Sequence, residues 1–323
     1  MGWSRQFKLA VSFSVLLLTM PFIANAASAQ GGSLIPMGHS IGIKMELSGV
    51  FFTNDVMIKK DHWLKAGDLI ERVDDVTIGT LADFETALLS SRRDNKEIAL
   101  HIVRNGDKSQ IQADSEAMKR LLPFLKDRTE GTGTLTYVDP DDGTYGALGH
   151  QIIDSALKSP PSFNTGAIYL SEIGQIKKSV PGIPGYKIST IVEDEDLLGT
   201  IQTNGVYGIF GAWNSAHRKV LTEPLEIMHP EQLQEGVAEI FTTIKGTEVE
   251  SFTIRITDVD HEQFHFVLTD PKLLAATGGI LQGMSGSPVI QNGKFVGAVT
   301  HMFVDDPEKG AGLFLETMRN GGK

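Results

Sequence analysis

The chain has 323 residues, of which 41% are hydrophobic and 21% charged, as is typical of a globular protein with room for two ordinary domains. Its formal net charge of -11 argues against nucleic-acid binding, because nucleic-acid-binding proteins gather Lys and Arg on one basic face. There is no cysteine, which excludes thiol catalysis, disulfides and thiolate metal sites. Any nucleophile must therefore be an oxygen.

Residues 1–29 have the order of a secretory signal. Arg5 and Lys8 come first, an apolar run follows over residues 9–23, and small residues suited to cleavage occupy residues 24–29. An uncleaved membrane anchor is the alternative, although about 15 apolar residues are short for a full span. Both interpretations place the rest of the chain outside the cytoplasm, secreted or on the outer face of the membrane.

Residues 33–113 predict a small α+β domain. Residues 40–45 alternate like a strand, and a turn at Gly67 leads into another strand. Thr80 can cap a helix, and Asn105–Gly106 reads as a hairpin turn after a strand over residues 97–103. The predicted helix carries four apolar residues at helical spacing, namely Leu81, Phe84, Leu88 and Leu89.

The residue pattern of the sequence changes after residue 113. Residues 114–130 predict a linker helix that Pro123 bends or interrupts. Residues 131–323 contain many short alternating segments separated by Gly, Pro, Asn and Asp. Strands that recur at close intervals without long helices between them indicate an all-β sandwich or barrel.

The segment Gly283-Met284-Ser285-Gly286-Ser287-Pro288 carries the strongest functional signal. Flanking glycines allow a tight turn that exposes the Ser285 hydroxyl and aims backbone N–H groups at one point, as acyl transfer requires for its oxyanion. The N–H groups of Gly283 and Ser285 are the predicted oxyanion hole. Taken as a bare pattern, the segment is also compatible with an ordinary glycine-rich turn.

A Gly-x-Ser-Gly-x-Pro segment that is followed by two apolar strands resembles the active-site segment of chymotrypsin-like serine peptidases. A closer resemblance, to the SpoIVB-type peptidases of spore-forming bacteria, rests on four segments. They are Tyr145-Gly146-Ala147-Leu148-Gly149-His150, Thr269-Asp270-Pro271, Thr277 to Pro288, and Gly297-Ala298-Val299-Thr300-His301. That resemblance implies a PDZ domain, a chymotrypsin-like double β-barrel, peptide-bond hydrolysis without a cofactor, and a role in sporulation signalling. Gln151 departs from the family pattern, in which glycine is expected after the histidine.

A serine nucleophile needs a base, and histidine suits neutral pH. The resemblance gives this role to His150. Spacing alone leaves the third member open among Asp154, Asp258, Asp260 and Asp270, and the resemblance selects Asp270. A turn or helix cap before Pro271 is the alternative role for Asp270.

Two further groups of residues are candidates for binding. His261 and His265 share a helical spacing, but their surroundings alternate like strands, which argues against a metal site. Thr300, His301 and Met302 follow the hairpin next to the nucleophile and are the predicted specificity residues, with an ordinary strand end as the alternative.

Ile41-Gly42-Ile43 resembles the carboxylate-binding loop of a PDZ domain, which implies a groove that binds an extended peptide at a sheet edge. The sequence thus predicts a mainly β protein: a PDZ-like α+β domain at residues 33–113 and a serine peptidase domain at residues 131–323. Its expected substrate is an exported or membrane-bound protein, including the enzyme itself. A secreted peptide-binding module with an inactive barrel is the rival hypothesis.

Overall fold

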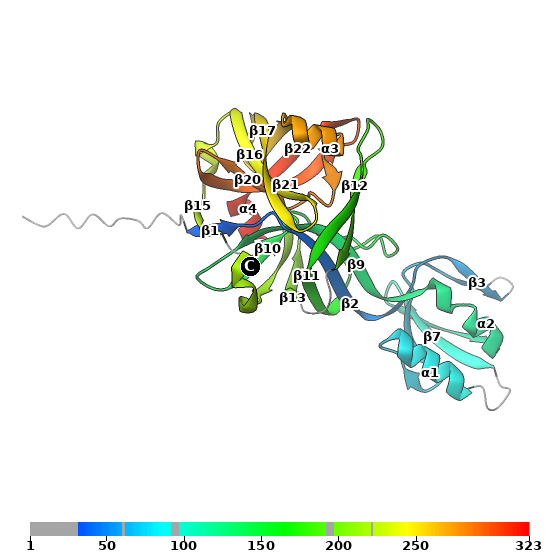
Figure 1. Cartoon of the computed structure of the whole chain (residues 1–323). Helices are drawn as coiled ribbons and strands as arrows, with labels where there is room; N and C mark the ends of the chain where they lie inside the picture. The colour runs from blue at the N-terminus through cyan, green and yellow to red at the C-terminus, as the bar shows by residue number, and fades with distance from the viewer. Residues whose placement is uncertain (1–31, 60–61, 92–96, 192–196, 221, 323) are drawn as a thin grey trace, which may run out of the picture. The chain divides into compact units, whose positions relative to one another are not determined.

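The computed structural model describes residues 32–59, 62–91, 97–191, 197–220 and 222–322, and the predicted signal at residues 1–29 lies outside them. Most of the described chain forms two closed antiparallel barrels (Figure 1). A smaller α+β part interrupts the first barrel between its first two strands in chain order. The prediction of a mainly β protein with two barrels is confirmed.

The first barrel is a ring of strands in which each hydrogen-bonds to both neighbours, and the ring closes where β2 pairs with β9. Its core is made of inward aliphatic side chains such as Ile43, Leu135 and Ile168. In ring order the strands are β2 (Ser40–Phe52), β9 (Leu125–Val138), β10 (Thr144–Ala147), β14 (Gly208–Trp213), β13 (Leu197–Gly205) and β11 (Phe163–Lys177).

Outside the PDZ-like part, four further strands extend the sheet of this barrel. β1 (Ser33–Pro36) pairs with β9 and with β15 (Leu225–Glu226). β12 (Gly185–Ile191) pairs with β11 and runs parallel to β19 (Leu281–Gln282). Because β19 leads directly into the predicted nucleophile loop, β12 connects that loop to the first barrel.

The second barrel, yellow to red in Figure 1, is closed around a core rich in phenylalanine that includes Phe252, Phe264 and Phe314. In ring order its strands are β16 (Gly236–Lys245), β17 (Glu248–Val259), β18 (Gln263–Leu268), β22 (Asp306–Phe314), β21 (Lys294–Phe303) and β20 (Pro288–Gln291). Helices α3 (Pro271–Thr277) and α4 (Leu315–Asn320) follow β18 and β22, and 3-10 turns occupy Ser215–Val220 and Pro230–Gln232.

The PDZ-like part continues from the end of β2, where Phe51 pairs with Leu69. Helix α1 packs its Phe84 and Leu88 into a separate apolar core, and Thr80 caps that helix by accepting from the Asp83 N–H. The elements are β3 (Val56–Lys59), β4 (His62–Leu64), β5 (Leu69–Val73), β6 (Val76–Thr77), α1 (Leu81–Ser91), β7 (Ile98–Arg104), β8 (Asp107–Ala113), α2 (Ser115–Lys119) and a 3-10 turn (Leu122–Phe124).

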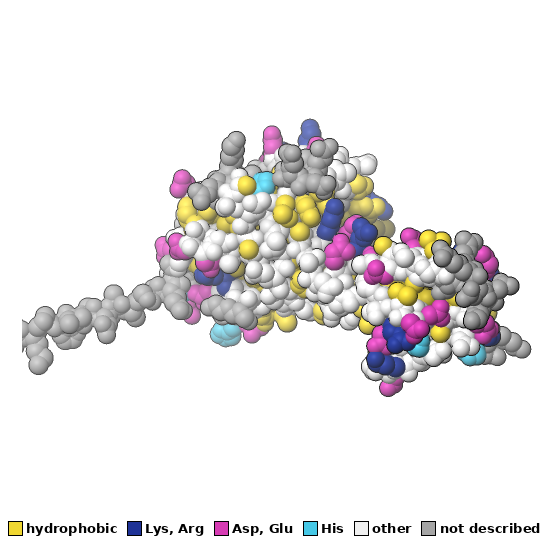
Figure 2. Space-filling model, turned by 90° about the horizontal axis from the view of Figure 1, so that it is seen from below, with side chains coloured by type: hydrophobic (Ala, Val, Ile, Leu, Met, Phe, Trp, Pro, Cys, Tyr) yellow, Lys and Arg dark blue, Asp and Glu magenta, His cyan; other side chains and the backbone are white. Residues whose placement is uncertain are grey.

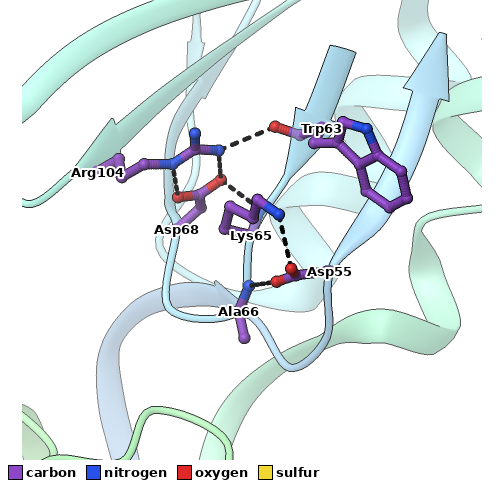
Figure 3. Close-up of polar contacts among 6 residues, drawn as sticks. All are labelled: Asp55, Trp63, Lys65, Ala66, Asp68 and Arg104. Atoms are coloured by element: carbon purple, nitrogen blue, oxygen red, sulfur yellow. Dashed lines mark hydrogen bonds and ion pairs between the residues drawn. The ribbon is translucent and has the colours of Figure 1, made fainter. Parts of the chain in front are cut away.

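An ion pair inside the PDZ-like part fixes its Gly67 turn (Figure 3). The Arg104 guanidinium donates to both oxygens of the buried Asp68 carboxylate and also to the Trp63 carbonyl. A two-point contact of this kind is more directional than a single hydrogen bond. It explains why the Lys-Ala-Gly-Asp segment forms a defined turn between β4 and β5.

Several predicted details differ from the structure. Ile41, Gly42 and Ile43 do not form a PDZ loop: they lie in β2, which is hydrogen-bonded to β9 on one side and β11 on the other, so neither edge is open to a peptide. Their alternation reads equally as a barrel strand buried on both sides, which is what forms. Leu89 is 62% exposed rather than on the buried face of α1.

The boundaries between the parts also differ. β1 and the first half of β2, inside the range predicted for the PDZ-like domain, belong to the first barrel. The linker helix ends at Lys119, and after the 3-10 turn around Pro123 the chain is already in strand β9 from Leu125. The peptidase part is therefore built from residues on both sides of the PDZ-like part.

The face drawn in Figure 2 has Lys and Arg side chains interspersed with Asp and Glu. No single-sign basic surface is visible on it, in keeping with the negative net charge. Of the helices in the described ranges, none combines the length and apolar character needed to cross a membrane.

Candidate active site

The nucleophile loop connects β19 to β20. Gly283 and Gly286 have φ of 95° and 94°, in the left-handed region that glycine adopts without strain. In this conformation the N–H groups of Gly283 and Ser285 find no acceptor among the residues that the structure describes, whereas the N–H of Gly286 donates to the Val299 carbonyl. Two such donors, one of them on the serine itself, are what the predicted oxyanion hole requires.

A residue of the first barrel, Thr134 on β9, holds this loop. Its N–H donates to the Ser285 carbonyl (3.0 Å), and its hydroxyl donates to the Gly283 carbonyl (2.7 Å). Its own carbonyl accepts from the Leu148 N–H (3.2 Å), in the loop that carries His150. Thr134 is fully buried and thus ties the serine loop to the histidine loop. No sequence pattern marks this role, because Thr134 is one of several threonines that alternate along an ordinary strand.

His150 follows a strained turn after β10. Leu148 has φ of 76°, a value that non-glycine residues rarely adopt, and Gly149 has φ of 71°. The loop that follows His150 is held by Asn204, which accepts from the Ile152 N–H and donates to the Ile152 carbonyl. Strain that is held in place by surrounding hydrogen bonds is typical of a functional position.

The His150 ring is oriented by a backbone carbonyl. Its Nδ1 lies 2.9 Å from the carbonyl oxygen of Gln151. Because a carbonyl only accepts, Nδ1 must carry the proton in this contact, and Nε2 is left unprotonated in the neutral ring. Nε2 is then the nitrogen free to act as a base.

Ser285 and His150 line one cavity of about 570 Å³. The predicted specificity residues Thr300, His301 and Met302 also line it. The Ser285 hydroxyl donates to the Thr300 carbonyl (3.2 Å) rather than to His150. The cavity therefore brings together the predicted nucleophile, base and specificity residues, while the serine hydroxyl donates to a backbone carbonyl. A contact of this kind commonly changes when substrate binds.

Comparisons with known proteins assign the chain to a family. The family model described as SpoIVB peptidase S55 matches residues 118–319, which is more than half of the chain, and a PDZ domain model matches residues 41–114. The chain belongs to the SpoIVB peptidase S55 family. It is a serine peptidase that contains a PDZ domain.

Solved structures with some similarity include the Rv3671c protease from M. tuberculosis. Its active form is 16% identical with a TM-score of 0.36, covering 60% of this chain and 73% of that chain. Its inactive form is 15% identical with a TM-score of 0.33, covering 59% of this chain and 82% of that chain. A search of curated proteins finds no match.

In this S55 peptidase Asp270 is not placed as the third member of a triad. It caps helix α3: one carboxylate oxygen accepts from the Leu273 N–H (3.0 Å) and the other faces the Thr253 N–H (3.4 Å). It does not line the cavity, and no ion pair within 4.0 Å joins it to His150 in the described ranges. The physical reason is local, because an Asp before Pro at a helix start satisfies otherwise unpaired N–H groups.

Asp154 does line the cavity of the S55 peptidase, but its carboxylate is fully engaged elsewhere. Lys126 and Thr129 donate to one oxygen, and the N–H groups of Ala156 and Leu157 donate to the other. Burial alone would raise the pKa of Asp154, yet these hydrogen bonds outweigh it and lower the pKa to about 2. Asp154 is thus a permanently charged structural anchor of the cavity wall.

The remaining candidates of the sequence lie apart from the cavity. His261 is in the turn between β17 and β18, and the His265 ring contacts the Asp258 carboxylate at 3.3 Å. Within the described ranges no group of three or more His, Asp or Glu is placed to hold a metal ion.

Proposed function

We propose that the chain is an exported endopeptidase that cleaves protein substrates with Ser285 as nucleophile and His150 as general base. One observation carries the proposal: the N–H groups of Gly283 and Ser285 have no acceptor among the described residues, and Ser285 lines the same cavity as His150, whose Nδ1 contacts a carbonyl and leaves Nε2 as the basic nitrogen. These are the three elements that acyl transfer needs.

The proposed reaction follows from this geometry. Substrate entering the cavity releases the Ser285 hydroxyl from the Thr300 carbonyl, and Nε2 of His150 accepts its proton as the oxygen attacks the scissile carbonyl. The negative oxygen that forms is stabilised by the N–H groups of Gly283 and Ser285. His150 then donates the proton to the leaving amine, and water completes hydrolysis by the same route. The Gln151 carbonyl takes the orienting position that a carboxylate holds in the usual triad.

The biological setting is proposed from the family and from the N-terminal sequence. A basic, apolar and small-residue order over residues 1–29 supports export, to the space between mother cell and forespore if the role is in sporulation signalling. The substrate is then another exported or membrane-bound protein, and self-cleavage belongs to the same proposal. The PDZ domain would supply peptide binding remote from the reacting bond.

The test is hydrolysis of an unfolded protein, casein, by the wild-type chain, a Ser285→Ala variant and a Ser287→Ala variant. Ser287 is the matched control, because its hydroxyl is buried and unpaired within the described structure. The proposal requires that Ser285→Ala remove hydrolysis and that Ser287→Ala retain most of it. Hydrolysis by Ser285→Ala at the wild-type rate would refute it, and a fully inactive wild-type chain would favour the peptide-binding module.

A further inference from the structure

Lys187 on β12 is buried in a position where the strand pattern would place an apolar side chain. It is 6% exposed, whereas its apolar neighbours Tyr186 and Ile188 are 38% and 44% exposed. A register shift of one residue would bury both neighbours and return the lysine to water. The fold keeps the lysine inward although burying an amine without a counter-ion is costly.

Among the residues that the structure describes, the amine of Lys187 has a single polar contact. Its Nζ lies 3.1 Å from the buried Thr242 hydroxyl, and in the described structure no carboxylate lies within 4.0 Å of it. Burial lowers the pKa of Lys187 to about 7, with no contribution from a neighbouring charge. At mildly alkaline pH the side chain is therefore uncharged in the folded protein.

Charged side chains on the adjoining strands face elsewhere. Glu172 and Lys177 on β11, and Glu239 and Lys245 on β16, are all exposed. β19, which runs beside β12, has no titratable side chain. Among the described residues, burial is therefore what lowers the pKa of Lys187.

The stem of Lys187 lies against the oxyanion loop. A Cβ atom built on Gly283 would lie 3.4 Å from Cδ of Lys187 and 3.7 Å from its Cβ and Cγ. The preceding residues of the two strands are paired, Gly185 with Leu281 and Tyr186 with Gln282. The lysine stem therefore packs against Gly283, whose N–H is a proposed oxyanion donor.

We propose that Lys187 is a positioning residue of this peptidase: its buried, uncharged side chain holds Gly283 in place, and protonation releases it. The inference rests on the proposed function, since it concerns the proposed oxyanion hole. A charged amine is stable only when hydrated, so protonation draws Nζ toward water and withdraws the stem from Gly283. Because oxyanion donors act only when they are correctly placed, the loop then loses catalytic competence.

The test measures the rate at which a fluorophosphonate labels Ser285 between pH 5 and pH 9. This range extends to both sides of the Lys187 pKa of about 7. The variants are Lys187→Met, which keeps the straight stem without an amine, and Lys177→Met as an exposed control on the adjoining strand. In wild type the logarithm of the rate is expected to fall at low pH with a slope approaching about 2, because His150 and Lys187 must both be deprotonated. Lys187→Met is expected to label at high pH and to fall with a slope of about 1, while Lys177→Met follows wild type.

Four results decide between the outcomes. A Lys187→Met chain that keeps the wild-type slope, or that folds but does not label at high pH, overturns the role of Lys187. Absence of labelling in wild type would refute the proposed function instead. Urea unfolding provides a readout that does not depend on catalysis. Because the pKa of Lys187 is lowered in the folded state, the free energy of unfolding should rise with pH between about 7 and 10. Lys187→Met should lose this rise. Equal rises in both chains would also overturn the inference.

Discussion

The imidazole rings of His150 and His301 lie with their centroids 6.0 Å apart, tilted by 37°, on the cavity wall that also carries Ser285. Burial lowers the pKa of His301 below its usual value, and the charge of His150 lowers it further. The pair therefore resists carrying two positive charges. In the proposed mechanism, His150 takes the serine proton while the lowered pKa of His301 favours its neutral form, which leaves His301 available for contacts with substrate.

The two histidines should separate kinetically. His150→Ala removes the base and is expected to lower kcat by about 10³-fold or more. His301→Ala removes a wall of the cavity and should raise KM more than it lowers kcat. Steady-state kinetics on a series of peptides checks both. The assignment of the base would be wrong if His301→Ala gave the larger loss in kcat.

Asp270 offers a direct choice between a helix cap and a triad member. Asparagine is as good a cap as aspartate, so Asp270→Asn should retain activity and stability, whereas Asp270→Ala should lose about 1 kcal/mol of unfolding free energy. A triad carboxylate would instead cost about 10⁴-fold in kcat on changing to Asn. Kinetics of the Asn variant decides, and a large loss there would return the carboxylate to the mechanism.

Much of the fold could be predicted from residues whose chemistry is local. The Gly-x-Ser-Gly segment, the Asn105–Gly106 turn with positive φ, and the Thr80 cap all depend on neighbours in the chain. Contacts between segments that are far apart in the chain have no comparable pattern in the sequence. Thr134 joins two loops through backbone carbonyls, which any alternating strand residue could do, and Ile41–Ile43 has the same pattern in a barrel strand as in a PDZ loop.

Thr134→Val tests the connection between the serine and histidine loops. Valine has nearly the same shape but no hydroxyl, so the Gly283 carbonyl loses its donor and the oxyanion loop is less firmly held. We expect kcat to fall by about tenfold or more with KM little changed. Thr134→Ser restores the hydroxyl and should recover most of the rate. Equal losses in the two variants would show that packing, rather than the hydrogen bond, is what matters.

The lowered pKa of Asp154 predicts that acid reduces the stability of the fold. Its folded pKa lies below the unfolded value of about 3.9, so the stability it contributes is complete above that pH and is lost as pH falls toward about 2. Asp154→Asn leaves the Lys126 amine without its partner, which should cost on the order of 3 kcal/mol at neutral pH. Urea unfolding at pH 7 and pH 3 measures both effects, and the variant should show the smaller change between them. An unchanged pH response would remove Asp154 as the anchor.

Identification of the residue that a fluorophosphonate modifies tests the central claim most directly. The wild-type chain is reacted with the probe, digested and mapped by mass spectrometry, beside His150→Ala and Ser287→Ala. Wild type and Ser287→Ala should carry one adduct each, on Ser285, and His150→Ala should react far more slowly. An adduct on any other residue, or equal reaction of His150→Ala, would contradict the assignment of Ser285 and His150.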